Sequence, residues 1–140
     1  MPVIDMQTMR YINLLDRASK VKTSKCFVYN NTIIFAVPGN LVSRAIGPAA
    51  SNIRSLQEKI GKRIKVIREA EGLKDAERFI SEIVSPIRFK SIDIRNEEKM
   101  MIINAGSIQN KAALFGRNKI RFEELKQITH DYFGLDLKIV

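Results

Sequence analysis

The sequence contains the same order of helical and β-favouring segments twice, and this repeat constrains the fold more than any other feature. Two glycines, Gly47 and Gly116, each separate two helical segments and lie 69 residues apart. The β-favouring runs around Ile33 and Met100 lie 67 residues apart. A near-constant offset over six elements indicates an internal duplication of one small module. The sequence therefore predicts an α+β chain in which a helix-strand-strand-helix-helix-strand unit occurs twice.

The first copy is predicted to extend to residue 72. Apolar residues at helical spacing indicate a helix that ends near Ser19. The pair Asn30-Asn31 separates two β-favouring runs and is typical of a hairpin, because asparagine tolerates the left-handed angles of a tight turn. The expected elements are a helix up to 19, strands at 26–29 and 32–37, helices at 40–46 and up to 60, and a strand at 62–68.

The second copy is predicted to occupy residues 73–140. A polar break at 69–73, centred on Gly72, marks the expected boundary, so the domains are 1–72 and 73–140. The break is too short for the two copies to tumble freely, and we expect one semi-rigid unit. The expected elements are a helix at 75–84, strands at 87–95 and 99–105, helices at 107–115 and 118–133, and a strand at 135–140.

The segment around Gly47 has the chemistry of a phosphate site. Glycine accepts backbone angles that end a helix, and small residues follow it. We expect Ser51 or Asn52 to accept hydrogen bonds from the N–H groups of the next helix. A helix N-terminus attracts anions, and Arg44 and Arg54 flank this one. An ordinary corner between two helices is the alternative interpretation.

The charge favours a polyanionic partner. The formal net charge is +9 and the isoelectric point is near 9.9. Residues 1–72 contain 12 Lys and Arg against 5 Asp and Glu, a net charge of +7, whereas residues 73–140 contain 12 against 10, a net charge of +2. Arg63 and Lys65 extend the positive charge along a predicted strand, where a solvated strand face is the alternative. Nucleic acid is the expected partner, mainly of the first copy.

Other classes of protein lack support in the sequence. There is no Gly-x-Ser-x-Gly or Walker motif, so we expect no enzymatic activity, no catalytic residue and no small-molecule substrate. His130 has no second His or Cys at zinc spacing, and we expect neither a metal nor a cofactor. The longest apolar run, 33–37, is too short to cross a membrane. A single cysteine, Cys26, and an N-terminus without signal-peptide features suggest the cytoplasm.

These segments carry a resemblance to a known family. The stretch Ala45-Ile-Gly-Pro-Ala-Ala-Ser-Asn-Ile-Arg54 resembles the phosphate-clamping loop of the KH domain and the start of its next helix, and Ala113-Leu-Phe-Gly-Arg-Asn-Lys-Ile-Arg121 is the matching stretch. The element order is similar to that of the prokaryotic (type II) KH domain. Two such modules in tandem resemble the archaeal NusA-like transcription termination and antitermination factors. The resemblance implies two tandem type II KH domains.

Both loops depart from the Gly-x-x-Gly pattern, which in the family clamps about four nucleotides. Ala50 and Lys119 stand where the second glycine is expected. We expect Ala50 to allow RNA to approach if its backbone angles are helical. The second loop has a shortened run into its helix, and there we expect Lys119 to act as a point charge. The residues expected to bind RNA are Arg44, Ile46, Gly47, Pro48, Ala49, Ala50, Ser51, Asn52, Arg54, Arg63, Lys65, Lys111, Gly116, Arg117, Asn118, Lys119 and Arg121.

The resemblance implies a non-enzymatic factor of transcription termination or elongation. We expect single-stranded RNA to lie extended across both modules, with phosphates on the N–H groups of 47–51 and bases over Ile46 and Ile64. RNA polymerase or the elongation complex is the further expected partner. A ribosome-associated or ribosome-assembly factor, and a protein-interaction adaptor with degenerate loops, are the alternatives. Gly47→Asp with Ala49→Asp is predicted to abolish RNA binding and preserve the fold.

Overall fold

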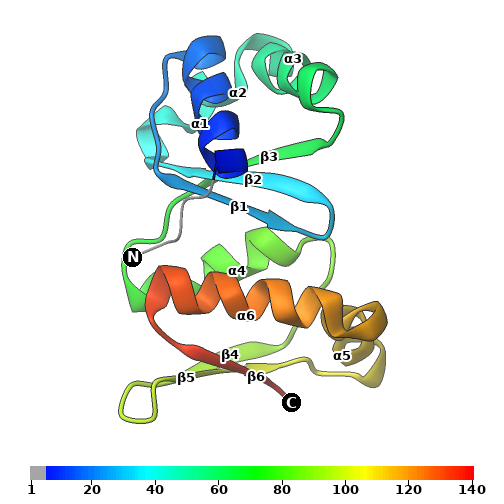
Figure 1. Ribbon diagram of the computed structural model, residues 1–140. Helices are drawn as coiled ribbons and strands as arrows, with labels where there is room; N and C mark the ends of the chain where they lie inside the picture. The colour runs from blue at the N-terminus through cyan, green and yellow to red at the C-terminus, as the bar shows by residue number, and fades with distance from the viewer. Residues whose placement is uncertain (1–5) are drawn as a thin grey trace. The chain divides into compact units, whose positions relative to one another are not determined.

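The computed structural model describes residues 6–140 and contains the predicted element order twice (Figure 1). The chain divides into two compact units between Glu69 and Ala70, within the polar break at 69–73. The first unit comprises α1 (Met6–Ser19), β1 (Lys25–Tyr29), β2 (Thr32–Val37), α2 (Val42–Ile46), α3 (Ser51–Ile60) and β3 (Arg63–Arg68). The second comprises α4 (Ala76–Val84), β4 (Ser91–Arg95), β5 (Met100–Asn104), α5 (Ile108–Phe115), α6 (Ile120–Phe133) and β6 (Asp136–Ile139).

The sheet of the first unit has the order β1-β2-β3. Strands β1 and β2 are antiparallel, and Tyr29 pairs with Thr32 across the turn. Asn30 and Asn31 both have left-handed angles, with φ of 50° and 58°, so the predicted hairpin is confirmed. Strands β2 and β3 are parallel. A parallel pair needs a crossover connection, and α2 and α3 supply it.

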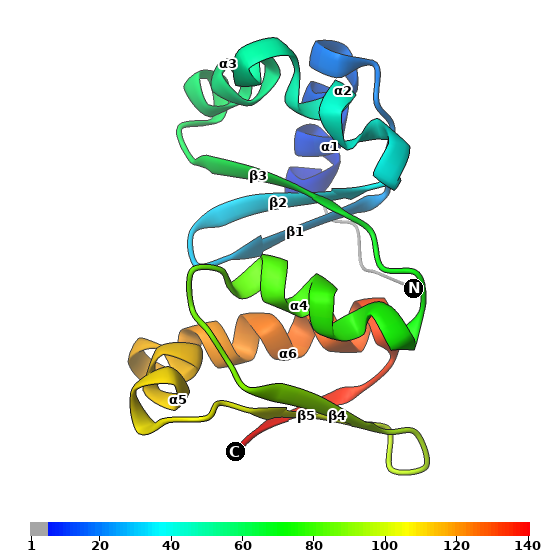
Figure 2. The ribbon, with the colours of Figure 1, turned by 180° about the vertical axis from the view of Figure 1, so that it is seen from behind.

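The three helices of the first unit lie on one face of its sheet, as Figure 2 shows. The core on that face joins α1 and β2 with the two crossover helices. Its fully buried members include Leu15, Phe35, Ala45 and Leu56, each with no exposed surface. Ile64 of β3 is 7% exposed and belongs to the same cluster. The core therefore fixes α2 and α3 against the sheet, and with them the turn around Gly47.

The second unit has the equivalent sheet, of order β4-β5-β6, with β4 antiparallel and β6 parallel to β5. The predicted strand at 87–95 is wrong in its first half, because the Ile87 N–H donates to the Val84 carbonyl at 2.9 Å and β4 begins at Ser91. The chain leaves α4 through a turn. The buried counterpart of Ile33 is Met101, with no exposed surface, whereas Met100 is half-buried. A shift of one residue reverses the face to which a strand side chain points.

The duplication is confirmed in the packing of the crossover helices. Ala45 and Leu114 are 69 residues apart, and so are Leu56 and Leu125, and all four are completely buried. No helix within residues 6–140 is long and apolar enough to cross a membrane.

Candidate nucleic-acid interface

Each unit has a tight turn between its two crossover helices, and the two turns share one backbone conformation. We call them the first elbow (residues 47–50) and the second elbow (residues 116–119). Gly47 has φ 81° and ψ 165°, and Gly116 has φ 71° and ψ 176°. The last two residues of each elbow are left-handed, with φ between 51° and 59°. The expectation of a shortened run into the second helix is wrong, because α3 begins at 51 and α6 at 120, again 69 residues apart.

The left-handed residues of the elbows are not glycines. They are Ala49 and Ala50 in the first elbow and Asn118 and Lys119 in the second. For a residue with a Cβ atom this conformation costs about 1–2 kcal/mol, although asparagine tolerates it better. The expectation that RNA can approach Ala50 requires this residue to have ordinary helical backbone angles, and Ala50 does not have them. Such strain persists only where the surrounding structure imposes it, and it often marks a functional site.

One side chain in each unit ties the two crossover helices together across the elbow. Asn52 Nδ2 donates to the Arg44 carbonyl at 3.1 Å, and Arg121 Nη1 donates to the Ala113 carbonyl at 2.9 Å. Donor and acceptor occupy equivalent positions in the two copies, because each pair is related by the 69-residue offset. A carbonyl at a helix C-terminus lacks an intrahelical partner, and this bond supplies one.

The tie explains why each elbow begins with glycine. A Cβ atom on Gly47 would lie 2.8 Å from Asn52 Nδ2, and one on Gly116 would lie 2.8 Å from Arg121 Cγ. The missing Cβ atom therefore makes room for the tying side chain, and the positive φ adds a second requirement for glycine. Gly47→Asp is therefore expected to strain the elbow and displace the Asn52 side chain, contrary to the sequence-based expectation that it preserves the fold.

The prediction that Ser51 or Asn52 caps the next helix is wrong. The residue that caps α3 is Ala50, which offers no side-chain hydrogen bond, and Asn52 uses its amide as a donor to the preceding helix. Asn52 and Arg121 thus have a structural role that sequence reasoning missed. The signal was available: both are side chains with N–H donors at the same position of the repeat.

Most N–H groups of the first elbow are already bonded. Gly47 donates to Ser43 O at 2.9 Å, Ala50 to Gly47 O at 3.1 Å and Ser51 to Pro48 O, and Pro48 has no N–H group. Within residues 6–140, Ala49 is the one residue of 47–51 whose N–H group has no such backbone acceptor. The first turn of α3 adds further donors, since helix N-termini leave them free. Fewer backbone donors face a ligand here than the sequence suggested.

The positive side chains around the first elbow have different surroundings. Arg44 donates from Nε to the Ser19 carbonyl at 3.2 Å, and Arg54 is exposed on α3. Arg63 and Lys65 alternate along β3 with Ile64 and Val66, which pack against the helices. Because strand side chains alternate between faces, Arg63 and Lys65 leave the sheet on the face opposite the elbow. The structure brings Arg44 and Arg54 to the elbow but not Arg63 and Lys65.

The surface of the first elbow is small and exposed. Pro48, Ala49 and Ser51 are exposed, and Ile46 is half-buried next to Gly47. Ile64 is part of the core and does not form the floor of a groove, so its expected contact with bases is wrong. The apolar contact available beside the first elbow is therefore Ile46.

The second elbow carries larger and more polar side chains. Arg117, Asn118 and Lys119 are exposed, as is Lys111 on α5. In place of Ile46 and Ile53 the second unit has Phe115 and Phe122, whose rings stack at 5.1 Å. Both rings are half-buried next to the second elbow in sequence, whereas the side chains of 117–119 are exposed.

Residues 6–140 contain no group of three His, Cys, Asp or Glu side chains that could hold a metal ion. Hydrogen bonds from Arg78 to Asp75, and then to Glu82, raise the pKa of the Arg78 guanidinium above its usual value. Arg78 contacts each carboxylate at 2.6 Å. These bonds hold the N-terminal part of α4 and lie outside the elbows.

Comparisons with known proteins agree with this architecture. A family model of the KH domain matches residues 32–81, which include the first elbow. A protein of Halococcus morrhuae described as "Probable transcription termination protein NusA" is 20% identical over 128 residues, covering 91% of this chain and 90% of the relative. A protein of Methanocaldococcus jannaschii with the same description is 24% identical over 91 residues, covering 65% of this chain and 48% of the relative. The crystal structure of APE1850 covers 98% of this chain and all of that one, with a TM-score of 0.68 and 25% identity.

The fold is consistent with two tandem KH domains, each with the helix-strand-strand-helix-helix-strand order, and the KH family model matches mainly within the first of them. The KH domain is a module of nucleic-acid recognition, and its turn between two helices clamps the nucleic-acid backbone. Within this class the chain is similar to the archaeal NusA-like transcription termination proteins.

Proposed function

We propose that the chain is a non-enzymatic RNA-binding factor of transcription termination or elongation, and that the first elbow is its principal RNA site. The observation that carries this proposal is the strained backbone of the first elbow, where two non-glycine residues have left-handed angles within the segment that the KH family model matches, and the second elbow repeats this conformation. Strain of this kind often marks a functional site. The NusA descriptions of the relatives support the transcription role.

The elbow recognises RNA through a few contacts. The Ala49 N–H group and the first turn of α3 donate to one phosphate, aided by the partial positive charge at the helix N-terminus. Arg54, and the Nη atoms of Arg44, neutralise neighbouring phosphates. Ile46 contacts a base. Small side chains at 48–51 keep the RNA backbone close to the protein.

The second elbow binds RNA mainly by charge. Arg117 and Lys119 are exposed and pair with phosphates, and single-stranded RNA extends over both elbows. The two elbows belong to separate domains, and we propose that these domains meet at 72/73, within the polar break at 69–73. The proposed partners are single-stranded RNA and RNA polymerase or its elongation complex. The proposed location is the cytoplasm.

The test replaces exposed elbow residues without touching the glycines. We expect Pro48→Asp with Ala49→Asp to weaken binding of a 12-nucleotide single-stranded RNA by about 100-fold, because two carboxylates repel the phosphates and aspartate tolerates left-handed angles. The matched pair in the second elbow, Arg117→Asp with Asn118→Asp, is expected to cost about 10-fold. Fluorescence anisotropy measures both. Unchanged affinity of the first pair would contradict the proposed site.

Co-purification separates the transcription role from its alternatives. A tagged chain isolated from cells with RNA polymerase supports the proposal. Recovery with ribosomal subunits would instead support the ribosome-associated alternative. Recovery with other proteins but without RNA would support the protein-interaction adaptor.

A further inference from the structure

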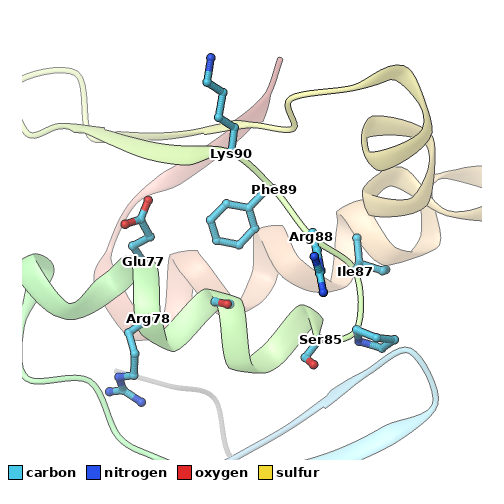
Figure 3. Close-up of a pocket in the computed structure, with 9 residues that line it drawn as sticks. Glu77, Arg78, Ser85, Ile87, Arg88, Phe89 and Lys90 are labelled. Atoms are coloured by element: carbon cyan, nitrogen blue, oxygen red, sulfur yellow. The ribbon is translucent and has the colours of Figure 1, made fainter.

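The second unit contains a cavity that belongs to neither elbow. It has a volume of about 680 Å³ and lies between α4 and the segment that leads into β4. Figure 3 shows its residues: α4 contributes Glu77, Arg78 and a serine, and the chain at 85–90 forms the opposite wall. A volume of this size is within the range of small-ligand sites.

The cavity combines an aromatic wall with cations. The Phe89 ring is half-buried and projects from the chain toward α4, between Glu77 and Arg88 in Figure 3. Arg88 and Lys90, its two neighbours in sequence, are exposed and have no ion-pair partner within the described residues. Arg78 is different, because Asp75 and Glu82 already hold its guanidinium. Positive charge is therefore available on the residues before and after Phe89, with the Lys90 side chain extending away from the ring in Figure 3.

Glu77 adds a directed hydrogen-bond acceptor. One carboxylate oxygen, Oε1, accepts the N–H of Ile92 at 3.1 Å, which holds the side chain against the start of β4. The other oxygen has no partner within the described residues. Because an ionised carboxylate only accepts hydrogen bonds, it favours ligands with amino groups.

We propose that this cavity binds one base of single-stranded RNA, stacked on Phe89, with its exocyclic amino group on Glu77 and its phosphates on Arg88 and Lys90. Unpaired bases are commonly recognised by stacking on aromatic rings and by hydrogen bonds to their edges. Cytosine, adenine and guanine carry an exocyclic amino group, and uracil does not. The inference rests on the proposed function, and it gives the RNA a contact outside the elbows.

The test measures affinity of the full chain for fluorescein-labelled 12-nucleotide oligo(C) and oligo(U). We expect oligo(C) to bind about 10-fold more tightly, as a well-placed polar contact to one base discriminates by roughly that factor. Glu77→Gln is expected to remove this preference, since glutamine retains an acceptor for Ile92 and presents an amide donor to the base. Glu97→Gln, in the turn before β5, is the matched control and is expected to retain it.

Two further variants probe the ring and the cations. Phe89→Leu keeps the apolar bulk and is expected to weaken oligo(C) binding about 10-fold, the scale of one lost stacking contact. Arg88→Ala with Lys90→Ala lies on the surface, and is expected to weaken binding several-fold and reduce the salt slope by about 1.4, at about 0.7 per phosphate contact. Lys74→Ala, an exposed lysine outside the cavity, is the control. An unchanged urea unfolding midpoint confirms that each variant folds.

The outcomes separate this inference from the proposed function. If the elbow pair Pro48→Asp and Ala49→Asp abolishes binding while all cavity variants behave like the wild type, the cavity inference is wrong and the proposed function stands. If the wild type binds neither oligonucleotide, both are wrong. If Phe89→Leu weakens binding of a glutamate-rich peptide but not of RNA, the occupant is an acidic protein segment and the inference is overturned.

Discussion

The two elbows have the same backbone but different side chains, and the comparison shows what the conformation requires. Both begin with a glycine of positive φ, continue through two left-handed residues and are tied by the side chain five residues after the glycine. At the place of the second glycine of the family pattern, one has Ala50 and the other Lys119. The first glycine and the tie are thus the shared features, while the second glycine is dispensable for the path of the chain.

The elbows differ most in the charges that flank them. The first has Arg44 and Arg54, whereas the equivalent positions of the second are Ala113 and Glu123. The second places its cations on the elbow itself, at Arg117 and Lys119. The two elbows therefore combine one backbone conformation with two arrangements of charge. Three sets of substitutions test how far the stability and the RNA affinity of each elbow depend on its side chains.

The largest expected effect concerns the ties. We expect Arg121→Ala to destabilise the second unit by about 2 kcal/mol and Asn52→Ala to destabilise the first by about 1 kcal/mol, because a hydrogen bond from a charged donor contributes more than one from a neutral amide. Urea unfolding, followed by hydrogen exchange of the elbow amides, measures both. Arg117→Ala is the control on the exposed surface. If Arg121→Ala is as mild as that control, the tie does not hold the second elbow.

The next effect concerns the flanking charges. Arg54→Glu is expected to lower RNA affinity about 10-fold, and Glu123→Arg to raise it several-fold, because each changes the number of cations that phosphates meet. The slope of log affinity against log salt should move by about 0.7 per cation gained or lost. Anisotropy titrations at several salt concentrations measure it. The control is a charge reversal at Glu58, one turn further along α3, which adds a cation. If it raises RNA affinity as much as Arg54→Glu lowers it, the site is not localised at the elbow.

The smallest effect concerns the left-handed residues. Ala50→Gly and Lys119→Gly are each expected to stabilise the protein by about 1 kcal/mol, since glycine adopts this conformation without a clash. Ala112→Gly, in the right-handed interior of α5, should instead destabilise it by about 1 kcal/mol. Thermal unfolding distinguishes the signs. For Lys119→Gly, RNA affinity is expected to fall a few-fold although stability rises, which separates the charge of Lys119 from its backbone.

Local sequence patterns predicted much of the fold. They failed where contacts between separate residues determine the local structure. The hairpin at Asn30-Asn31 was predictable because two adjacent asparagines favour a tight turn. The start of β4 was not, since Ile87 and its neighbours have strand-like composition and only the hydrogen bond to Val84 shows that they turn. The alternation along β3 predicted that Arg63 and Lys65 point to the face opposite Ile64 and Val66. Only the structure showed that the helices and the elbow cover the face of Ile64 and Val66.

The sequence by itself determined the duplication, the order of elements, the position of both elbows and the excess of positive charge in the first copy, because periodicity, glycine and charge are properties of single residues and their spacing. Only the tertiary structure decided that Asn52 and Arg121 tie the helices, that Ala50 is left-handed and that Glu77 and Phe89 line one cavity. These depend on atoms from separate segments meeting at particular distances, and no pattern along one strand or helix encodes such a meeting.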